Sequence, residues 1–239
     1  DPDFVRIPVT SLTDTAYCHR RMAAYSALRA TPSSEVKAGD PGTRGEHEQT
    51  THFSIVDSEG NAVAQTTTLN DSYGSKVVVR GAGFLLNNEM DDFSIKPGVP
   101  NMYGLIGSDA NAIAPGKRML SSMTPTIVEK DGRLRLVVGT PGGSTIITSV
   151  FQTVVNIIDY RLSVQDAVAA PRFHHQWLPD RITLERPCLD SATRAELQQR
   201  GHTLWDREAI GRVDAIACSP SGVVTGGADP RGDDAADGF

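Results

Sequence analysis

The residue best suited to chemistry in this sequence is Thr50, which lies where a polar linker meets a segment that alternates like a β-strand. If the chain were cut immediately before it, Thr50 would carry both a hydroxyl group and a free α-amine. The pKa of such an amine is about 7.7–8.0, so the amine can act as a general base near neutral pH. Thr50 could then serve as a nucleophile without a histidine. The alternative is that Thr50 and Thr51 only begin a strand, and these two residues alone do not exclude it.

Two further groups of residues are suited to binding charge. Glu89, Asp91 and Asp92 form an acidic cluster that can bind a cation through charge-assisted hydrogen bonds, although a solvated acidic turn has the same composition. Gly142 and Gly143 precede a segment with helical periodicity. A helix N-terminus favours negative charge. The glycine pair itself predicts a turn ahead of a helix.

The spacing of the histidines and cysteines does not indicate a metal site. His174 and His175 are adjacent on an extended segment and point to opposite sides, with no carboxylate or cysteine at a metal-site spacing. We expect them to have a packing role. Cys18, Cys188 and Cys218 are scattered and odd in number, which is typical of neither a disulfide framework nor a zinc site. We expect three free thiols in partly buried positions.

The segments before Thr50 differ sharply in composition. Residues 11–30 carry apolar positions at helical spacing, with Asp14 as an N-cap signal, which predicts a helix. Residues 31–49 are rich in charges, Pro and Gly and contain almost nothing apolar, which predicts an exposed, mobile linker.

The remainder of the chain predicts strand hairpins interleaved with helices. The hairpins pair residues 51–57 with 62–69, 125–130 with 133–139, and 213–218 with 223–226. The second contains Asp131-Gly132, a strong hairpin signal. Helices are expected to run from residue 145 to 160, 164 to 170 and 190 to 200, and a strand over 182–185. This order favours a layered α+β fold.

Composition and charge argue against two classes of function. The chain has 239 residues with a formal net charge of −6, and 39% of its residues are hydrophobic, which is typical of a globular protein. Binding to nucleic acid would require a basic face, and no basic cluster follows an apolar stretch as a membrane-surface role would require. The apolar run of residues 146–158 is too short and too polar to span a bilayer. Because the chain starts at Asp1 without a methionine, the missing signal peptide says nothing about the compartment.

Several blocks of the sequence resemble the γ-glutamyltransferase family, also called γ-glutamyltranspeptidases or glutathione hydrolases. The blocks occupy residues 49–54, 66–70, 85–94, 96–101, 120–125, 139–144, 170–175 and 229–231. Among them are Gln-Thr-Thr-His-Phe-Ser, Asn-Asn-Glu-Met-Asp-Asp-Phe-Ser and Gly-Thr-Pro-Gly-Gly-Ser, in the family's order. By this resemblance, residues 1–49 are the end of a large subunit and residues 50–239 are the small, catalytic subunit.

The resemblance implies a fold and a maturation step. The family belongs to the N-terminal-nucleophile hydrolases, α+β proteins with an αββα sandwich, in which a precursor cleaves itself to release the nucleophile. The cut would fall between Gln49 and Thr50, the junction that the residue pattern indicates independently. The family also takes an essential arginine from the large subunit, most of which is absent from this chain, so the chain alone should bind substrate poorly.

The resemblance also assigns roles to individual residues. Thr68 would orient Thr50, and Gly142 and Gly143 would form the oxyanion hole. The residues that would bind substrate are Asn70, Glu89, Asp92, Ser121 and Ser122. In that set the two acidic residues would bind the α-ammonium of the glutamyl group, and the two serines would bind its α-carboxylate.

The implied reaction is attack of Thr50 on the γ-carbonyl of glutathione or a related γ-glutamyl amide, followed by transfer to water, an amino acid or a dipeptide. Residues 97–107, which include Tyr103, would form a lid over the bound glutamyl group. No cofactor and no metal are implied, and the implied partner is the large subunit of the same precursor. Because bacterial members are mostly periplasmic or secreted, we expect one of those locations.

Three alternatives remain open from the sequence. A cephalosporin or glutaryl acylase shares the Thr-Thr-His-Phe-Ser start but binds a group without an α-ammonium, so Asp92 favours the γ-glutamyl function. An enzyme that cleaves poly-γ-glutamate would need an open groove, and the lid-like segment over residues 97–107 argues against it. Finally, the chain as written joins Gln49 to Thr50, so it could be an unprocessed precursor or a binding module without activity.

Overall fold

The computed structural model describes residues 1–6, 8–36, 50–101 and 105–238. Most of the predicted linker, Gln49 of the predicted cleavage site and Tyr103 of the predicted lid therefore lie outside the described residues. No helix among the described residues has the length and apolar character that crossing a membrane requires.

The N-terminal segment forms two short helices, α1 (Val9–Leu12) and α2 (Thr15–Met22). The prediction of a single helix over residues 11–30 is wrong, although its cap signal is real. The Asp14 carboxylate accepts a hydrogen bond of 2.8 Å from the Tyr17 N–H. Asp14 adopts an extended backbone (φ −69°, ψ 127°) as the N-cap of α2, and an extended residue at that point separates α1 from α2.

A two-stranded sheet begins at Thr50. Strands β1 (Thr50–Val56) and β2 (Ala62–Thr68) pair antiparallel, with Thr50 opposite Thr68, which confirms the first predicted hairpin. In the turn between them, the Asp57 carboxylate accepts hydrogen bonds from the N–H groups of Glu59 and Asn61. Local turn chemistry thus sets the register that places the two threonines opposite each other.

A four-stranded antiparallel sheet forms the next layer. Its order is β3-β4-β8-β9, and the strands are β3 (Thr126–Lys130), β4 (Arg133–Gly139), β8 (Asp214–Cys218) and β9 (Val224–Gly227). Both remaining predicted hairpins, β3–β4 and β8–β9, are confirmed. The central pair β4–β8 joins segments far apart in the sequence.

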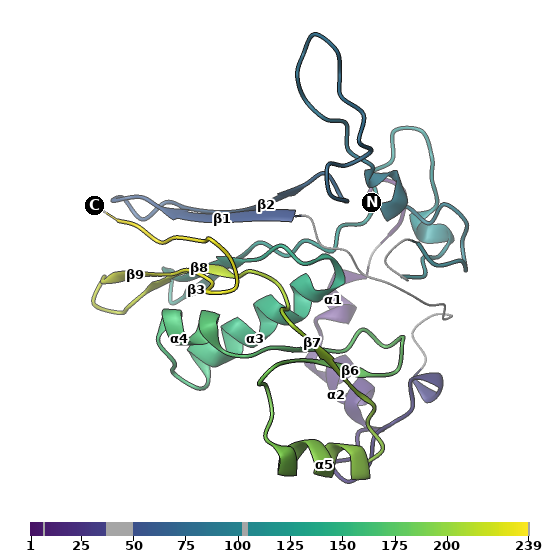
Figure 1. Ribbon diagram of the computed structural model, residues 1–239, viewed down its shortest axis with the longest axis vertical. Coiled ribbons are helices and arrows are strands. Elements are labelled where there is room, and N and C mark those ends of the chain that lie inside the picture. Colours follow the sequence, from purple (N-terminus) through teal and green to yellow (C-terminus); the bar gives the residue numbers. More distant parts are fainter. Residues whose placement is uncertain (7, 37–49, 102–104, 239) are drawn as a thin grey trace.

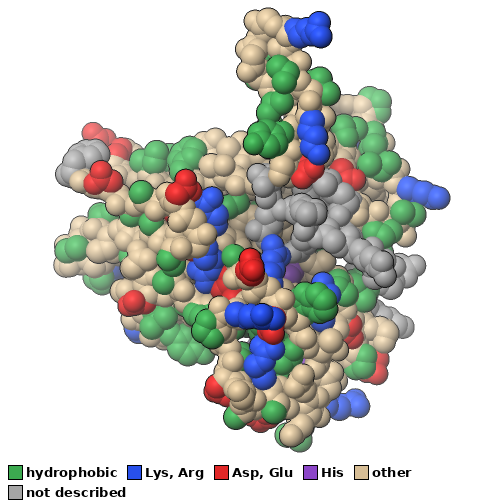
Figure 2. Space-filling view, viewed as in Figure 1, with side chains coloured by type: hydrophobic (Ala, Val, Ile, Leu, Met, Phe, Trp, Pro, Cys, Tyr) green, Lys and Arg blue, Asp and Glu red, His purple; other side chains and the backbone are tan. Residues whose placement is uncertain are grey.

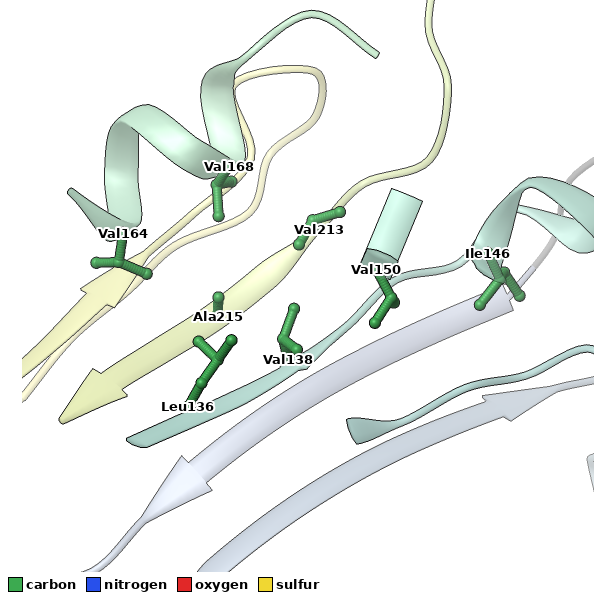
Figure 3. Close-up of a cluster of buried hydrophobic side chains, with 8 residues drawn as sticks. All are labelled: Leu136, Val138, Ile146, Val150, Val164, Val168, Val213 and Ala215. Carbon is green, nitrogen blue, oxygen red and sulfur yellow. The ribbon is translucent and has the colours of Figure 1, made fainter. Parts of the chain in front are cut away.

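Helices cover one face of this sheet, and the β1–β2 hairpin covers the other (Figure 1). The helices are α3 (Ile146–Ile158) and α4 (Val164–Ala169), both predicted. Between helices and sheet lies the hydrophobic core, whose side chains point toward one another in Figure 3. Its buried members are Leu136, Val138, Ile146, Val150, Val164, Val168, Val213 and Ala215. Within the described residues the outer face of β1–β2 remains exposed at Phe53, Ile55 and Val63.

A smaller sheet lies beside this body. Strands β5 (Phe173–His174) and β6 (Ile182–Glu185) are antiparallel, and β6 runs parallel to β7 (Leu204–Arg207). Helix α5 (Ser191–Gln199) forms the crossover between the parallel strands. The sequence predicted β6 and α5, but not β5 or β7.

Buried ion pairs connect the smaller sheet to the end of the chain. Arg172 is 2% exposed and contacts the Asp229 carboxylate at 2.6 Å. Arg231 contacts Glu185, on β6, at 2.5 Å, and Asp229 at 3.0 Å. The Glu185 carboxylate also accepts hydrogen bonds from the N–H groups of Arg172 and Ile210. Each buried charge therefore has partners of opposite charge, as burial requires.

The chain between β2 and the acidic turn at Glu89–Asp92 forms an arm that projects from the body (Figures 1 and 2). It is a short hairpin in which Val78 bridges Leu85. Apolar side chains on the arm are exposed, among them Val77, Val78 and Phe84.

Candidate functional site

The predicted nucleophile and its orienting threonine lie together at the end of the β1–β2 hairpin. Thr50 and Thr68 are cross-strand partners, so their side chains share one face of the hairpin. Both line a hollow with Leu69, Asp71 and Tyr73. The Thr68 hydroxyl accepts a hydrogen bond of 2.8 Å from the Asn70 N–H, which fixes that side chain at the end of β2.

His52 anchors the nucleophile strand to the sheet beneath it. It lies on the same face as Thr50, is 6% exposed, and forms hydrogen bonds through both ring nitrogens. Nδ1 lies 2.8 Å from Thr66 Oγ1, and Nε2 lies 3.0 Å from Ser54 Oγ. Burial lowers the pKa of His52 to about 4, so the ring is neutral near pH 7.

The ring of His52 lies directly against the end of β4. A Cβ added at Gly139 would lie 2.2 Å from His52 Cε1, far inside van der Waals contact. Glycine at this position therefore lets β1 approach β4 closely. His52 therefore holds the strand in place.

The predicted oxyanion hole is a glycine turn ahead of α3. Gly142 has φ 143° and Gly143 has φ 54°, in the region of backbone space that favours glycine. A 3₁₀ turn (Gly143–Thr145) continues directly into α3. The Gly142 carbonyl accepts hydrogen bonds from the Thr145 N–H at 3.0 Å and its hydroxyl at 2.7 Å. These bonds fix the orientation of the Gly142–Gly143 peptide at the start of the helix.

A pocket of about 230 Å³ lies beside this turn, and it brings together part of the predicted substrate-binding set. Asp92 lines it from a 3₁₀ turn (Glu89–Asp92), Ser122 lines it from the segment before β3, and Ser144 lines it from the glycine turn. The Ser144 hydroxyl donates a hydrogen bond of 2.6 Å to Gln176 Oε1. Ser144 thus links the candidate oxyanion hole to the acidic pocket.

Other members of the predicted set lie outside this lining. Ser121 is exposed, and its hydroxyl accepts a hydrogen bond of 3.1 Å from the Met123 N–H. Glu89 is half-buried on the acidic turn. Asn70 is 5% exposed, and its Nδ2 donates to the Asn88 carbonyl at 3.2 Å. Asn70 therefore joins the end of β2 to the acidic turn, and its contact with substrate stays a prediction.

Two carboxyl groups on the acidic turn have raised pKa values. Burial, then the charge of Glu89, then that of Asp91, raise the pKa of Asp92 to about 6. Burial also raises the pKa of Glu89. A ligand ammonium placed against Asp92 would reverse this effect, because an opposite charge favours the ionised carboxylate.

Several positions important to this geometry were not singled out by the sequence analysis. Asn88 accepts the Asp71 N–H at 2.9 Å through its side chain and thereby ties the Thr50 hollow to the acidic turn. The Gln176 side chain accepts a hydrogen bond from the Ser144 hydroxyl. Gly139, which has no Cβ, allows the His52 ring to pack against β4. An asparagine or glutamine gives no sequence signal for such bridges, because its partners are far away in the chain. Gly139 did have a signal in the sequence, because a glycine at the end of a buried strand often marks a close approach by another segment.

The described residues include no group of His, Cys, Asp and Glu that could hold a metal ion. His174 is buried and bonds to Thr148 Oγ1 at 2.8 Å and Gln176 Oε1 at 3.0 Å, which is the packing role predicted for it. Cys188 and Cys218 are partly buried free thiols, as predicted, whereas Cys18 is exposed. That part of the prediction is wrong because α2, which carries Cys18, has no buried residue.

The segment before residue 37 is held by contacts to the rest of the chain. The Ser33 N–H donates to Asp180 Oδ2 at 2.8 Å, and the Trp177 indole N–H donates to the Ser33 carbonyl at 2.7 Å. Arg118 contacts the carboxylates of Asp1 and Asp3. These non-covalent contacts do not depend on the peptide bond before Thr50.

Comparison with known proteins is consistent across sequence and structure. The sequence model of the family described as gamma-glutamyltranspeptidase matches residues 1–239. A glutathione hydrolase proenzyme of Escherichia coli (strain K12) is 52% identical over 231 residues, covering 97% of this chain and 40% of the relative. The acylase ACY 1 proenzyme of Pseudomonas sp. (strain SE83) is 36% identical over 234 residues, covering 98% of this chain and 39% of that protein.

Among solved structures, the T380A mutant of gamma-glutamyltranspeptidase from Helicobacter pylori superimposes with a TM-score of 0.74 at 52% identity. The match covers 76% of this chain and 100% of that chain. The chain spans about two fifths of the length of the two curated relatives described above.

Proposed function

Because this chain belongs to the γ-glutamyltranspeptidase family, we propose that it is the catalytic part of an enzyme that hydrolyses γ-glutamyl amides such as glutathione or transfers their glutamyl group. The observation that carries the proposal is the pocket in which Asp92, Ser122 and Ser144 meet beside the glycine turn. The E. coli relative is named a glutathione hydrolase proenzyme, which supports the substrate class and a precursor that is processed.

Maturation would begin with self-cleavage between Gln49 and Thr50. The cut frees the Thr50 α-amine, which then serves as the general base for the Thr50 hydroxyl. The contacts of Ser33 with Asp180 and Trp177 would keep the preceding segment attached after the peptide bond is broken. The mature protein would therefore be a heterodimer of large and small subunits.

Turnover would proceed through a covalent γ-glutamyl ester. Thr50 Oγ attacks the γ-carbonyl carbon, and its proton passes through the α-amine to the departing amine as the C–N bond breaks. The oxyanion of the tetrahedral intermediate would accept hydrogen bonds from the N–H groups of Gly142 and Gly143. Water or an acceptor amine then attacks the ester and restores the Thr50 hydroxyl.

Recognition of the glutamyl group would depend on complementary charge. Burial and acidic neighbours disfavour the ionised form of Asp92, and a substrate α-ammonium would offset that cost. Ser122, which also lines the pocket, would donate a hydrogen bond to the α-carboxylate. Glu89 and Ser121 would assist from positions next to these two, and Tyr103 would belong to the lid.

Two parts of the proposal concern the rest of the precursor. The large subunit would supply an arginine for the α-carboxylate, in addition to the serines of this chain. We also propose that the mature enzyme is periplasmic or secreted, as most bacterial members of the family are.

A matched pair of substrates tests this function against an acylase. γ-Glutamyl-p-nitroanilide and glutaryl-p-nitroanilide differ only in the α-ammonium, and the full-length precursor should be expressed and assayed with both. We expect the wild type to prefer the γ-glutamyl compound strongly, and Asp92→Ala to remove most of that preference while self-cleavage continues. A wild-type preference for the glutaryl compound would support the acylase function instead. A single uncleaved chain without turnover would support a binding module.

A further inference from the structure

Asn111 connects the two sides of the acidic pocket through the two ends of one side chain. It lies in a 3₁₀ turn (Asp109–Asn111) and itself lines the pocket. Its Nδ2 donates a hydrogen bond of 2.7 Å to the Asp92 carbonyl. Its Oδ1 accepts a hydrogen bond of 3.0 Å from the Leu120 N–H, two residues before Ser122.

The backbone of Asn111 adds a further bond to the acidic side. The Ser94 N–H donates to the Asn111 carbonyl at 2.9 Å, so Asn111 holds the chain both at Asp92 and two residues beyond it. Residues 94 and 112 also form a bridge between the two segments. The acidic side of the pocket is thus attached to Asn111 at several points.

The turn that carries Asn111 is held from outside the pocket. The Lys117 ammonium donates hydrogen bonds of 2.8 and 2.9 Å to the carbonyls of Ala110 and Ala112, the residues on either side of Asn111. With the backbone fixed on both sides, the short Asn side chain has little freedom to follow either partner. It therefore acts as a rigid spacer.

From this geometry we propose that Asn111 is the positioning residue that sets the separation between the ammonium-binding and carboxylate-binding sides of the pocket. The proposal rests on the γ-glutamyl function above. A substrate with both charged groups on one carbon needs their two partners at a defined spacing, and a loss of that spacing weakens binding. The Asn111 amide supplies both the donor for the Asp92 carbonyl and the acceptor for the Leu120 N–H from one short side chain.

Two substitutions separate positioning from general stability. Asn111→Ala removes both hydrogen bonds. Asn111→Asp keeps the acceptor for the Leu120 N–H but places a carboxylate against the Asp92 carbonyl and adds negative charge beside Asp92. Asn61→Ala is the matched control, because the Asn61 amide also donates to an aspartate, Asp57 at 2.8 Å, but in the exposed β1–β2 turn.

The experiment uses the full-length, self-cleaved enzyme with γ-glutamyl-p-nitroanilide as the substrate. For Asn111→Ala we expect self-cleavage as in the wild type and a KM raised roughly ten- to hundredfold, with a smaller change in kcat. For Asn111→Asp we expect in addition that the acidic limb of the kcat/KM profile moves to higher pH, because the added charge further disfavours ionised Asp92. Asn61→Ala should match the wild type in self-cleavage, KM, kcat and pH profile.

An unchanged KM in Asn111→Ala, with the wild type active, would overturn the inference and leave the proposed function intact. Equal losses of self-cleavage and turnover would also overturn it, because they would indicate a general defect of folding. If Asn111→Ala does not fold, the Asn111→Asp variant provides the test. An unchanged pH profile together with an unchanged KM in that variant would refute the positioning role of Asn111. A wild type without γ-glutamyl turnover would remove the proposed function and this inference together.

Discussion

Replacing Gly139 by alanine tests how the nucleophile strand is held in place. The added methyl group would lie 2.2 Å from His52 Cε1, 2.3 Å from Nδ1 and 2.6 Å from Nε2. The ring must then move away, since the other partner in the clash is the backbone of a central strand. Movement of the ring would break its hydrogen bonds to Thr66 and Ser54 and displace β1 next to Thr50.

The expected cost follows from these two effects. Overpacking a close-packed interior costs about 1–3 kcal/mol, and each lost hydrogen bond costs about 0.5–1.5 kcal/mol. We therefore expect Gly139→Ala to lower the free energy of unfolding by about 2–6 kcal/mol. We also expect slower self-cleavage, since Thr50 is two residues from His52 on the same face of β1.

The assay is urea unfolding of the full-length precursor in the Thr50→Ala background, where the proposed cleavage does not occur and all variants stay single chains. Gly238→Ala is the control, because an added Cβ there meets nothing within 4 Å. A double-mutant cycle with His52→Ala identifies the cause, since removal of the ring makes room for the methyl group. In the His52→Ala background, Gly139→Ala should therefore lower the free energy of unfolding much less than it does when His52 is present. A loss below about 0.5 kcal/mol in the single variant, or strictly additive effects in the cycle, would refute the reasoning.

Three other predictions address the chemistry. Thr50→Ala should abolish both self-cleavage, measured as intact mass, and γ-glutamyl turnover; residual turnover would require a different nucleophile. Because burial and acidic neighbours raise the pKa of Asp92 to about 6, kcat/KM for a γ-glutamyl substrate should rise with pH through that region as Asp92 ionises. Asp92→Asn should remove this limb, and a limb that persists would belong to another group. Gly142→Val should slow acylation about 10²–10³-fold by crowding the oxyanion site, as measured in single-turnover experiments, and an unchanged acylation rate would exclude Gly142 from the oxyanion hole.

The sequence alone predicts the parts of this fold that depend on local interactions. The three main hairpins follow from strand alternation and turn residues, both of which operate within a few positions along the chain. The pairing of Thr50 with Thr68 is a consequence of the first hairpin's turn. The helix starting after Gly143 and the helix that Asp190 caps were likewise visible as local patterns.

Where local signals compete, the sequence analysis was less successful. Apolar spacing across residues 11–30 suggested one helix, but the Asp14 cap separates α1 from α2, and residues 23–30 are not helical. The strand β7 was missed because its pairing with β6 is parallel and depends on the α5 crossover. A strand of four residues has too little pattern of its own to reveal a partner of that kind.

The sequence by itself determined which residues have the right chemistry: a threonine at a linker–strand junction, an acidic cluster, a serine pair and a glycine pair. Only the tertiary structure decided how they meet, with Asp92, Ser122 and Ser144 around one pocket and Ser121 facing solvent. It also showed the side chains that hold them, such as His52 over Gly139 and Asn111 between Asp92 and Leu120. The physical reason is that polar bridges and close packing join segments far apart in the chain, whereas periodicity and turn chemistry report only on near neighbours.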